Sequence, residues 1–332
     1  MRPLLPFTLV LALTTGASAD VETALTTHVL PGFARFAESA RLLEQAARAD
    51  CRPARVAPAW NAAFDAWISV ADLRIGPSET GALSVAFWPD DRGFTPRALI
   101  GLIAAADPIG RDPAAYANVS IAARGLFALE MLLHDPAFAG YGPDDYACVL
   151  VQTISADLAK QADTLAAAWT DDFASTLLTA GGADNATYLT DDEAVRALYT
   201  QILTGLEWTA STRLGRPMGT FERPRPRMAE AWRSGRSLRN TVLAAEAAHA
   251  LAKALAQDLI PGDLPQTDAA LARVLNTAAG ISDAAFQDVE NPQARLRVEV
   301  LQQAVQGLRA AIETEIGGTL GIVPGFNAQD GD

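Results

Sequence analysis

The stretch Arg124-Gly125-Leu126-Phe127-Ala128-Leu129-Glu130-Met131-Leu132-Leu133 decides how this chain is organised. Its residues are apolar at nearly every position, which predicts a helix buried on all sides, because a surface helix would keep a polar face. Glu130 is the only carboxylate in the stretch, and a charge in such surroundings needs a cation, a metal ion or a proton. Gly125 leaves room for a neighbouring helix or a ligand to come close. The function therefore depends on what Glu130 faces.

The rest of the sequence indicates an all-α protein. Half of the 332 residues are apolar, so a sizeable core can form. Apolar residues recur at helical spacing, and no alternating strand pattern is present. The length suits two helical bundles. We expect an N-terminal bundle over residues 20–190, a C-terminal bundle over residues 191–316 and a flexible tail over residues 317–332.

Proline, glycine and polar clusters give the finer boundaries. We expect Pro58 to open a helix, whose buried face then holds Trp60, Phe64 and Trp67 at helical spacing. Further helices are expected over residues 113–133 and 228–255, and a break between helices at residues 170–172.

Residues 1–19 resemble a secretory signal. Arg2 supplies the positive start, Leu4 to Leu13 form a short apolar run, and Ala17-Ser18-Ala19 precedes Asp20 as a small-residue cleavage site. The apolar run is too short to serve as a permanent anchor. We therefore expect an exported protein, in a bacterial periplasm, without stable membrane insertion.

Cys51 and Cys148 are the only cysteines. In an exported protein, a lone pair of cysteines is more often a disulfide than a metal or redox site. Such a bridge would close a long loop and stabilise the fold by roughly 3–5 kcal/mol on the chain-entropy model.

Positive charge is concentrated in one segment of an acidic protein. The formal net charge is −13, which argues against nucleic acid and anionic membrane surfaces as partners. Yet eight arginines lie between residues 213 and 239. They could bind a small anionic or metal-containing ligand, or they could neutralise acidic neighbours such as Glu130 across a domain interface. The residues of this segment expected at a ligand site are Arg223, Arg225, Trp232, Arg233, Ser234, Arg236 and Ser237.

A second segment, residues 86–93, reads as a structured loop. Trp88 and Asp90 in it could form a ligand wall, or the loop could be an aromatic plug over a helix end. The sequence contains no serine-hydrolase elbow and no zinc-protease motif. His28 and His249 are expected to be ordinary surface or packing residues.

The central stretch resembles the signature of the imelysin family, also called peptidase family M75, which is written Gly-x-His-x-x-Glu within a helix. Gly125 and Glu130 match this signature, and Phe127 stands where the family has its histidine. The resemblance continues, in the family's order, at Leu30 to Phe33, Cys51, Trp60 to Trp67, Arg74 to Pro77 and Phe87 to Asp90, and in a segment of a bacterial branch at Glu230 to Ser237. It implies an exported protein of two helical bundles, a functional site between them, and a link to iron uptake or iron-regulated physiology.

The resemblance also implies a metal site, which this sequence alters. A histidine and a glutamate three residues apart share one helix face and can reach one metal ion, but Phe127 has no lone pair to donate. His134 lies four residues after Glu130 and could form a rearranged pair with it for iron or another divalent metal, given further ligands. Because His134 stands at the helix end beside Asp135-Pro136, the alternative is a capping or exposed role.

We therefore expect a non-catalytic periplasmic binding or accessory protein, associated with iron by resemblance. Its site would lie between the bundles and include Gly125, Phe127, Glu130, Trp88 and Asp90. One alternative is an M75-type metallopeptidase with an altered ligand set. Another is that Glu130 merely anchors a salt bridge between the domains.

Overall fold

The structure is a computed structural model that describes residues 20–257, 259–260 and 262–320. The described chain is helical and contains no strand, which confirms the all-α prediction. The expected signal at residues 1–19 and the tail from residue 321 onward lie outside the described residues. In the part that the structure covers, no helix combines the length and the apolar character needed to cross a membrane.

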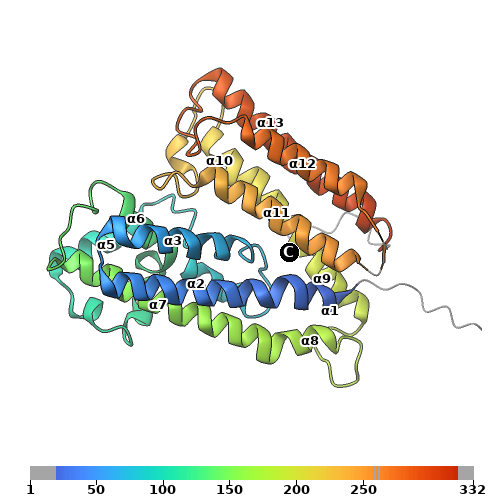
Figure 1. The fold of residues 1–332 in the computed structure, drawn as a ribbon, viewed down its shortest axis with the longest axis horizontal. Coiled ribbons are helices and arrows are strands. Elements are labelled where there is room, and N and C mark those ends of the chain that lie inside the picture. Colours follow the sequence, from blue (N-terminus) through green and yellow to red (C-terminus); the bar gives the residue numbers. More distant parts are fainter. Residues whose placement is uncertain (1–19, 258, 261, 321–332) are drawn as a thin grey trace, which may run out of the picture.

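The first helical group comprises residues 21–178. Its longest helices are α2 (Leu30–Ala49), α3 (Pro53–Ile68) and α7 (Tyr146–Ala168), and α2 packs against the other two (Figure 1). The shorter helices of this group are α1 (Val21–Ala24), α4 (Ser78–Val85), α5 (Phe94–Ala105), α6 (Gly125–His134) and α8 (Ala174–Leu178).

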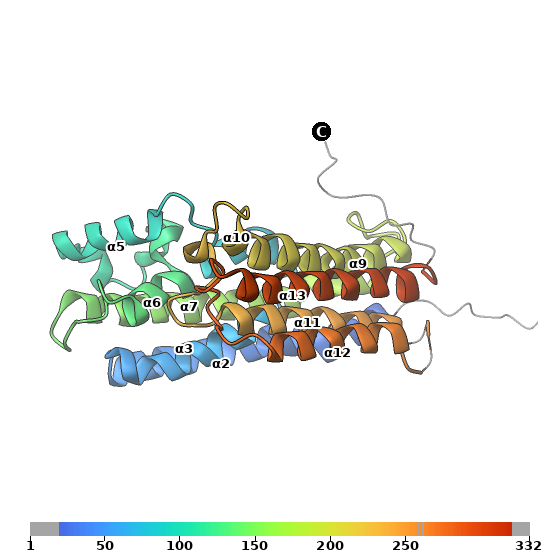
Figure 2. The ribbon, with the colours of Figure 1, turned by 90° about the horizontal axis from the view of Figure 1, so that it is seen from above.

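The second helical group comprises residues 191–312. It contains α9 (Asp191–Trp208), α10 (Gly215–Met218), α11 (Ser237–Ala256), α12 (Pro265–Ala279) and α13 (Pro292–Ile312). Helices α12 and α13 lie side by side, and α11 joins the groups because it also contacts α1 and α3 (Figures 1 and 2). The two groups match the expected two bundles, and the boundary at residue 190 stays a prediction.

The expected aromatic stripe of α3 lies in the core. Trp60, Phe64 and Trp67 are all buried, and they share one helix face because they follow one another at intervals of three and four residues. The indole N–H of Trp60 donates a hydrogen bond to the carbonyl of Leu126 (3.1 Å), which ties α3 to the start of α6. This contact fixes the helix that carries Glu130.

Two expected helix boundaries are wrong because the helices continue through them. Pro58 lies inside α3, which begins at Pro53, a proline in the first turn where its missing N–H is tolerated. Residues 170–172 belong to a π-helical turn, Trp169–Phe173, that carries α7 into α8. Trp169 is buried in this turn and its indole N–H donates to the hydroxyl of Ser78 (2.7 Å), so packing of the aromatic ring outweighs the polar residues beside it.

Two other expected helices are shorter than predicted. Residues 113–124 form turns and short 3-10 segments, and α6 begins only at Gly125, whose φ of 70° does not belong to a right-handed helix. Residues 228–236 are also irregular, since Ala231 and Gly235 have φ values of 48° and 72°. Such values interrupt a helix. The second of these segments lies next to Glu130, because Ser234 donates two hydrogen bonds to it.

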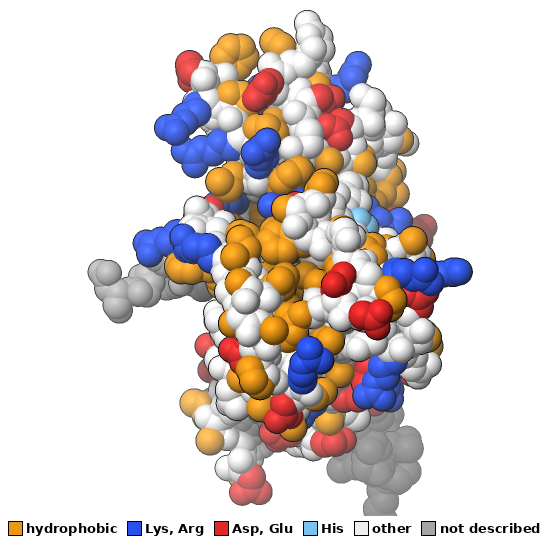
Figure 3. Space-filling view, turned by 90° about the vertical axis from the view of Figure 1, so that its left-hand side faces the viewer, with side chains coloured by type: hydrophobic (Ala, Val, Ile, Leu, Met, Phe, Trp, Pro, Cys, Tyr) orange, Lys and Arg blue, Asp and Glu red, His pale blue; other side chains and the backbone are white. Residues whose placement is uncertain are grey.

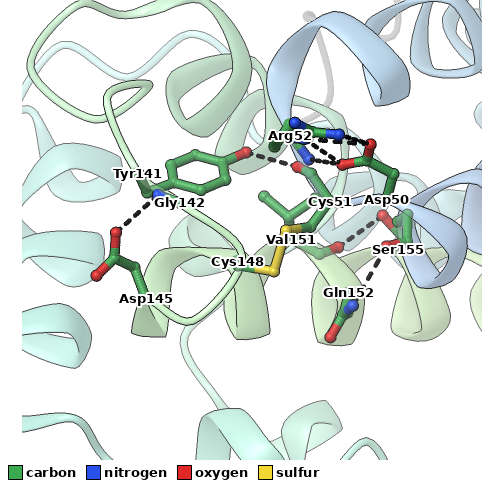
Figure 4. Close-up of a disulfide and its surroundings, with 11 residues drawn as sticks. Asp50, Cys51, Arg52, Tyr141, Gly142, Asp145, Cys148, Val151, Gln152 and Ser155 are labelled. Atoms are coloured by element: carbon green, nitrogen blue, oxygen red, sulfur yellow. Dashed lines mark hydrogen bonds and ion pairs between the residues drawn. A yellow bond between two sulfur atoms is a disulfide. The ribbon is translucent and has the colours of Figure 1, made fainter.

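The structure confirms the disulfide between Cys51 and Cys148, whose Cα atoms are 5.4 Å apart (Figure 4). Cys51 lies in the turn between α2 and α3, and Cys148 lies in the first turn of α7. The hydroxyl of Tyr141 donates to the carbonyl of Cys51 (3.0 Å), which adds a second link between the same two segments.

Candidate functional site

Gly125 sets the position of α6. A Cβ atom on this residue would lie 2.1 Å from the carbonyl oxygen of Val85 and 2.5 Å from that of Ser84. These distances leave no room for a side chain, and the positive φ favours glycine as well. The space beside Gly125 is therefore filled by the end of α4. The expectation that a neighbouring helix comes close is confirmed, and Gly125 is not among the residues that line the pocket described below.

Glu130 is buried in α6, with 2% of its surface exposed. The backbone N–H and the hydroxyl of Ser234 both donate hydrogen bonds to its Oε1 atom, over 3.0 Å and 2.9 Å. Burial raises the pKa of Glu130, and the Ser234 hydrogen bonds and the charge of Arg233 oppose that shift. Glu130 thus meets the second helical group through a serine, so the salt-bridge interpretation is wrong for the described residues.

A pocket of about 130 Å³ lies beside Glu130. Three segments border it: the loop before α5 with the start of that helix, α6 itself, and the irregular segment before α11. Of the residues expected at a site, it brings together Trp88, Asp90, Phe127, Glu130, Trp232 and Arg233. Residues that sequence reasoning missed at the pocket include Thr95, Met131, Arg227 and Met228.

Aromatic rings form one side of the pocket. The ring of Trp88 is stacked on that of Phe127, with centroids 6.4 Å apart and planes inclined by 18°. Trp88 also meets Trp208 of α9 edge to face at 6.2 Å, and Phe127 meets Phe64 edge to face at 5.5 Å. Phe127 is therefore a packing residue between the core and the pocket wall.

Asp90 lines the pocket, but its carboxylate is already engaged. Oδ1 accepts a hydrogen bond from the backbone N–H of Phe94 and Oδ2 accepts one from that of Thr95, both over 2.8 Å. These are the free N–H groups of the first turn of α5, which such a carboxylate satisfies. Asp90 therefore fixes the wall of the pocket by capping a helix. The hydroxyl of Thr95 is buried and has no hydrogen-bond partner in the described chain.

Two arginines of the rich segment reach the pocket. Arg233 pairs with Asp135 just after α6, with 2.6 Å between Nε and Oδ2, and its guanidinium lies 4.5 Å from the centre of the Trp232 ring. Arg227 is exposed and forms no ion pair with any residue that the structure describes. Arg233 is thus partly neutralised, whereas Arg227 keeps its charge available.

The remaining arginines mostly hold the two helical groups together. Buried Arg213 pairs with Asp72 and Glu230. Arg236, only 3% exposed, donates to Asp65 and Asn61 of α3. The further pairs are Arg216 with Asp91 and Arg239 with Asp65. The interpretation of these residues as partners of acidic neighbours is confirmed.

Several expected ligand residues are therefore not at the pocket. Arg236 is used in the α3 contact, and the hydroxyl of Ser237 donates to the carbonyl of Glu230 (2.7 Å). Arg223 and Arg225 lie in an exposed loop outside the pocket. Ser234 supports the site indirectly, through its two hydrogen bonds to Glu130.

The side chains around Glu130 do not fit the metal site that the resemblance implies. Phe127 offers no donor atom, and Glu130 has only Oε2 free of hydrogen bonds from the described residues, so it would contribute a single oxygen. The ring of His134 packs 5.0 Å from that of Trp60, and burial together with Arg236 lowers its pKa. Across the described residues, no group of three or more His, Cys, Asp or Glu side chains is arranged to hold a metal ion.

Comparison with known proteins places the chain in a family. The family model of the imelysins, Peptidase M75, matches residues 29–312. The crystal structure of an imelysin-like protein from Psychrobacter arcticum 273-4 has a similar fold, with a TM-score of 0.75 and 20% sequence identity, covering 94% of this chain and 99% of that one.

A second crystal structure, of a "putative iron-regulated protein A precursor" from Parabacteroides distasonis ATCC 8503, is also similar. It aligns with a TM-score of 0.68 and 14% identity, over 93% of this chain and 96% of that one. The comparison with curated proteins gave no match. These identities show a shared fold, and the family model spans most of the described residues. The chain therefore belongs to the imelysin family.

Proposed function

We propose that this chain is a periplasmic, non-catalytic binding or accessory protein, associated with iron uptake or iron-regulated physiology. The signal-like residues 1–19 support export, as does the description of the Parabacteroides protein as a precursor. The same description supports the link to iron. The observation that carries the proposal is the pocket of about 130 Å³ beside the buried carboxyl group of Glu130.

The chemistry of Glu130 favours binding over hydrolysis. A metallopeptidase needs a metal-bound water, and no group of three or more His, Cys, Asp or Glu side chains among the described residues is arranged to hold the metal ion. Burial raises the pKa of Glu130, so its carboxyl group keeps a proton to a higher pH than an exposed glutamate does. A protonated carboxyl group can donate a hydrogen bond to a ligand. The residues present therefore suit recognition.

Metal and peptidase assays on residues 20–332, purified without a histidine tag, test the non-catalytic part of this proposal. Iron, zinc and copper would be titrated by calorimetry into the wild type, Glu130→Gln and Phe127→His, and each variant would be incubated with a mixed peptide library. We expect no stoichiometric metal binding and no cleavage by the wild type. Cleavage that disappears in Glu130→Gln would overturn the proposal in favour of a metallopeptidase with an altered ligand set.

Native mass spectrometry of protein isolated from the periplasm tests the binding part without assuming a ligand. Met228 lies half-buried at the pocket, so Met228→Trp should fill it. Leu296→Trp is the matched control, because Leu296 is 58% exposed on α13 and does not line the pocket. We expect a bound small molecule in the wild type and the control and its loss in Met228→Trp. Equal ligand content in all three would refute binding in this pocket.

A further inference from the structure

We infer that the pocket recognises a small organic anion, a carboxylate carried on a flat apolar body about the size of one ring. This inference rests on the proposed binding function and names the chemical class of the ligand. It follows from the charges around the pocket, from the free oxygen of Glu130 and from the aromatic wall.

The charge balance at the pocket favours an anion. Its lining includes two cations, Arg227 and Arg233, and two acidic side chains, Asp90 and Glu130. Asp135 pairs with Arg233, and the negative charge of Asp90 is spread over two backbone N–H groups of α5. Arg227 has no acidic partner among the described residues, and Glu130 is buried away from water. An arginine guanidinium donates to a carboxylate in a matching planar geometry, which makes Arg227 the anchor for the anion.

Glu130 offers the second polar contact. Both hydrogen bonds from Ser234 fall on Oε1, and Oε2 accepts none from the described residues. Oε2 is therefore the oxygen available to the pocket, and in the protonated acid it can donate an O–H hydrogen bond. A donor of this kind pairs with a carboxylate through a short, charge-assisted hydrogen bond. An anionic ligand would in turn keep the proton on Glu130.

The walls and volume of the pocket set the shape of the ligand. Trp88, stacked on Phe127, and Trp232, beneath Arg233, present aromatic surface, and Met131 adds an adaptable apolar side chain. A protein cavity of roughly 150 Å³ holds one benzene molecule, so a pocket of about 130 Å³ accommodates a group of similar size. The part of a ligand that enters the pocket is therefore about one ring in size, and inorganic phosphate lacks an apolar body to cover the rings.

Benzoate is a suitable probe because it combines one ring with one carboxylate. Its binding to residues 20–332 would be measured by isothermal titration calorimetry, together with benzyl alcohol and inorganic phosphate. We expect benzoate to bind at least tenfold more tightly than benzyl alcohol or phosphate. Affinities for benzyl alcohol or phosphate equal to that for benzoate would overturn the inference, as would no measurable binding of benzoate.

Variants separate the proposed contacts. Arg227→Gln should weaken benzoate binding at least tenfold, whereas Arg223→Gln, an equally exposed arginine outside the pocket, should not change it. Glu130→Gln should retain binding, because its amide N–H can replace the acid O–H. Equal affinities for Arg227→Gln and Arg223→Gln would refute the anion site, and loss of benzoate binding in Glu130→Gln would contradict the donor role of Glu130.

The native mass spectrometry described above keeps the two proposals distinguishable. If the wild type carries a pocket-bound molecule that benzoate does not displace, the carboxylate inference fails and the binding function stands. If neither benzoate nor any isolated molecule occupies the pocket, both fail.

Discussion

Replacing Gly125 by alanine tests the arrangement that holds Glu130 at the pocket. The backbone at this position has a φ of 70°, and the added Cβ would lie 2.1 Å from the carbonyl oxygen of Val85. A left-handed conformation costs an L-residue about 1–2 kcal/mol. Overpacking adds about 1–3 kcal/mol, because the obstructing atom belongs to the backbone and has little freedom to move. The free energy of unfolding should therefore fall by about 2–5 kcal/mol.

Urea unfolding followed by circular dichroism at 222 nm measures this loss. Gly101→Ala is the matched control, since Gly101 lies inside α5 and a Cβ there would meet nothing within 4 Å. Alanine favours helix over glycine by about 0.8–1 kcal/mol, so this control should be as stable as the wild type or more stable. The expected loss in the free energy of unfolding is about 2–5 kcal/mol. If Gly125→Ala lost less than about 1 kcal/mol, the close packing of α6 against α4 would be refuted.

Three further perturbations give measurable outcomes. Reduction of the Cys51–Cys148 bridge should lower the free energy of unfolding by about 4–5 kcal/mol on the chain-entropy model, because the bridged residues are 97 positions apart. Urea titrations with and without dithiothreitol measure this loss. Asp65→Asn should destabilise the fold by about 2–3 kcal/mol in the same titration, since buried Arg236 loses its carboxylate partner. Burial raises the pKa of Glu130, so the stability this group contributes is complete below the ordinary glutamate pKa and is lost as pH rises through the raised value. Glutamine does not ionise, so Glu130→Gln does not lose this stability. Its melting temperature should therefore rise relative to that of the wild type as the pH is raised from 4 to 8.

Each of these outcomes has its own check. Asp163→Asn is the control for Asp65→Asn, because Asp163 and its partner Arg41 are both about half exposed, and exposed pairs contribute little. Equal losses in the two variants would contradict the importance of burial. An unchanged urea midpoint after reduction would contradict the disulfide prediction. If the melting temperatures of Glu130→Gln and the wild type differed by the same amount at every pH, folding would not raise the pKa of Glu130.

The pH experiment depends on the charged groups that face Glu130. The charge of Arg233 favours the ionised carboxylate of Glu130, and the charge of Glu230 opposes it. Arg227 and Asp90 also line the pocket. These four charged groups are present in both the wild type and Glu130→Gln. Subtracting the Glu130→Gln curve from that of the wild type isolates the contribution of Glu130.

Local patterns were enough to predict the buried helix and the disulfide. The helix follows from an unbroken apolar stretch around Glu130, and the bridge follows from two cysteines in an exported chain. The predicted helix starts at residues 113 and 228 are wrong because the backbone there departs from helical geometry although the local pattern favours a helix. Residues 113–124 keep an apolar content typical of a helix but form turns, and Ala231 has a positive φ that its residue type disfavours.

The site was predictable only in part, because local sequence patterns do not show which distant residues meet. Sequence reasoning placed Glu130, Phe127 and Trp88 together because they belong to one resemblance, and the pocket brings them together. It left open whether Glu130 meets a cation, a metal ion or a proton. In the structure Ser234, 104 positions away, donates to its carboxyl group, a contact that depends on tertiary packing. Arg227 was missed because nothing in the sequence separates the one unpaired arginine at the pocket from its neighbours in the same run.

In every described ion pair between the two helical groups, the same group provides the positive charge. Wherever such a pair joins the groups in the described chain, the second group provides an arginine of residues 213–239 and the first provides an aspartate. Within these pairs the first group is therefore always the negative partner and the second group the positive one. If two copies met through identical surfaces, like charges would oppose each other, which suppresses wrong partners. The charges of these pairs thus favour contact between the two groups of one chain over contact between like groups of two chains.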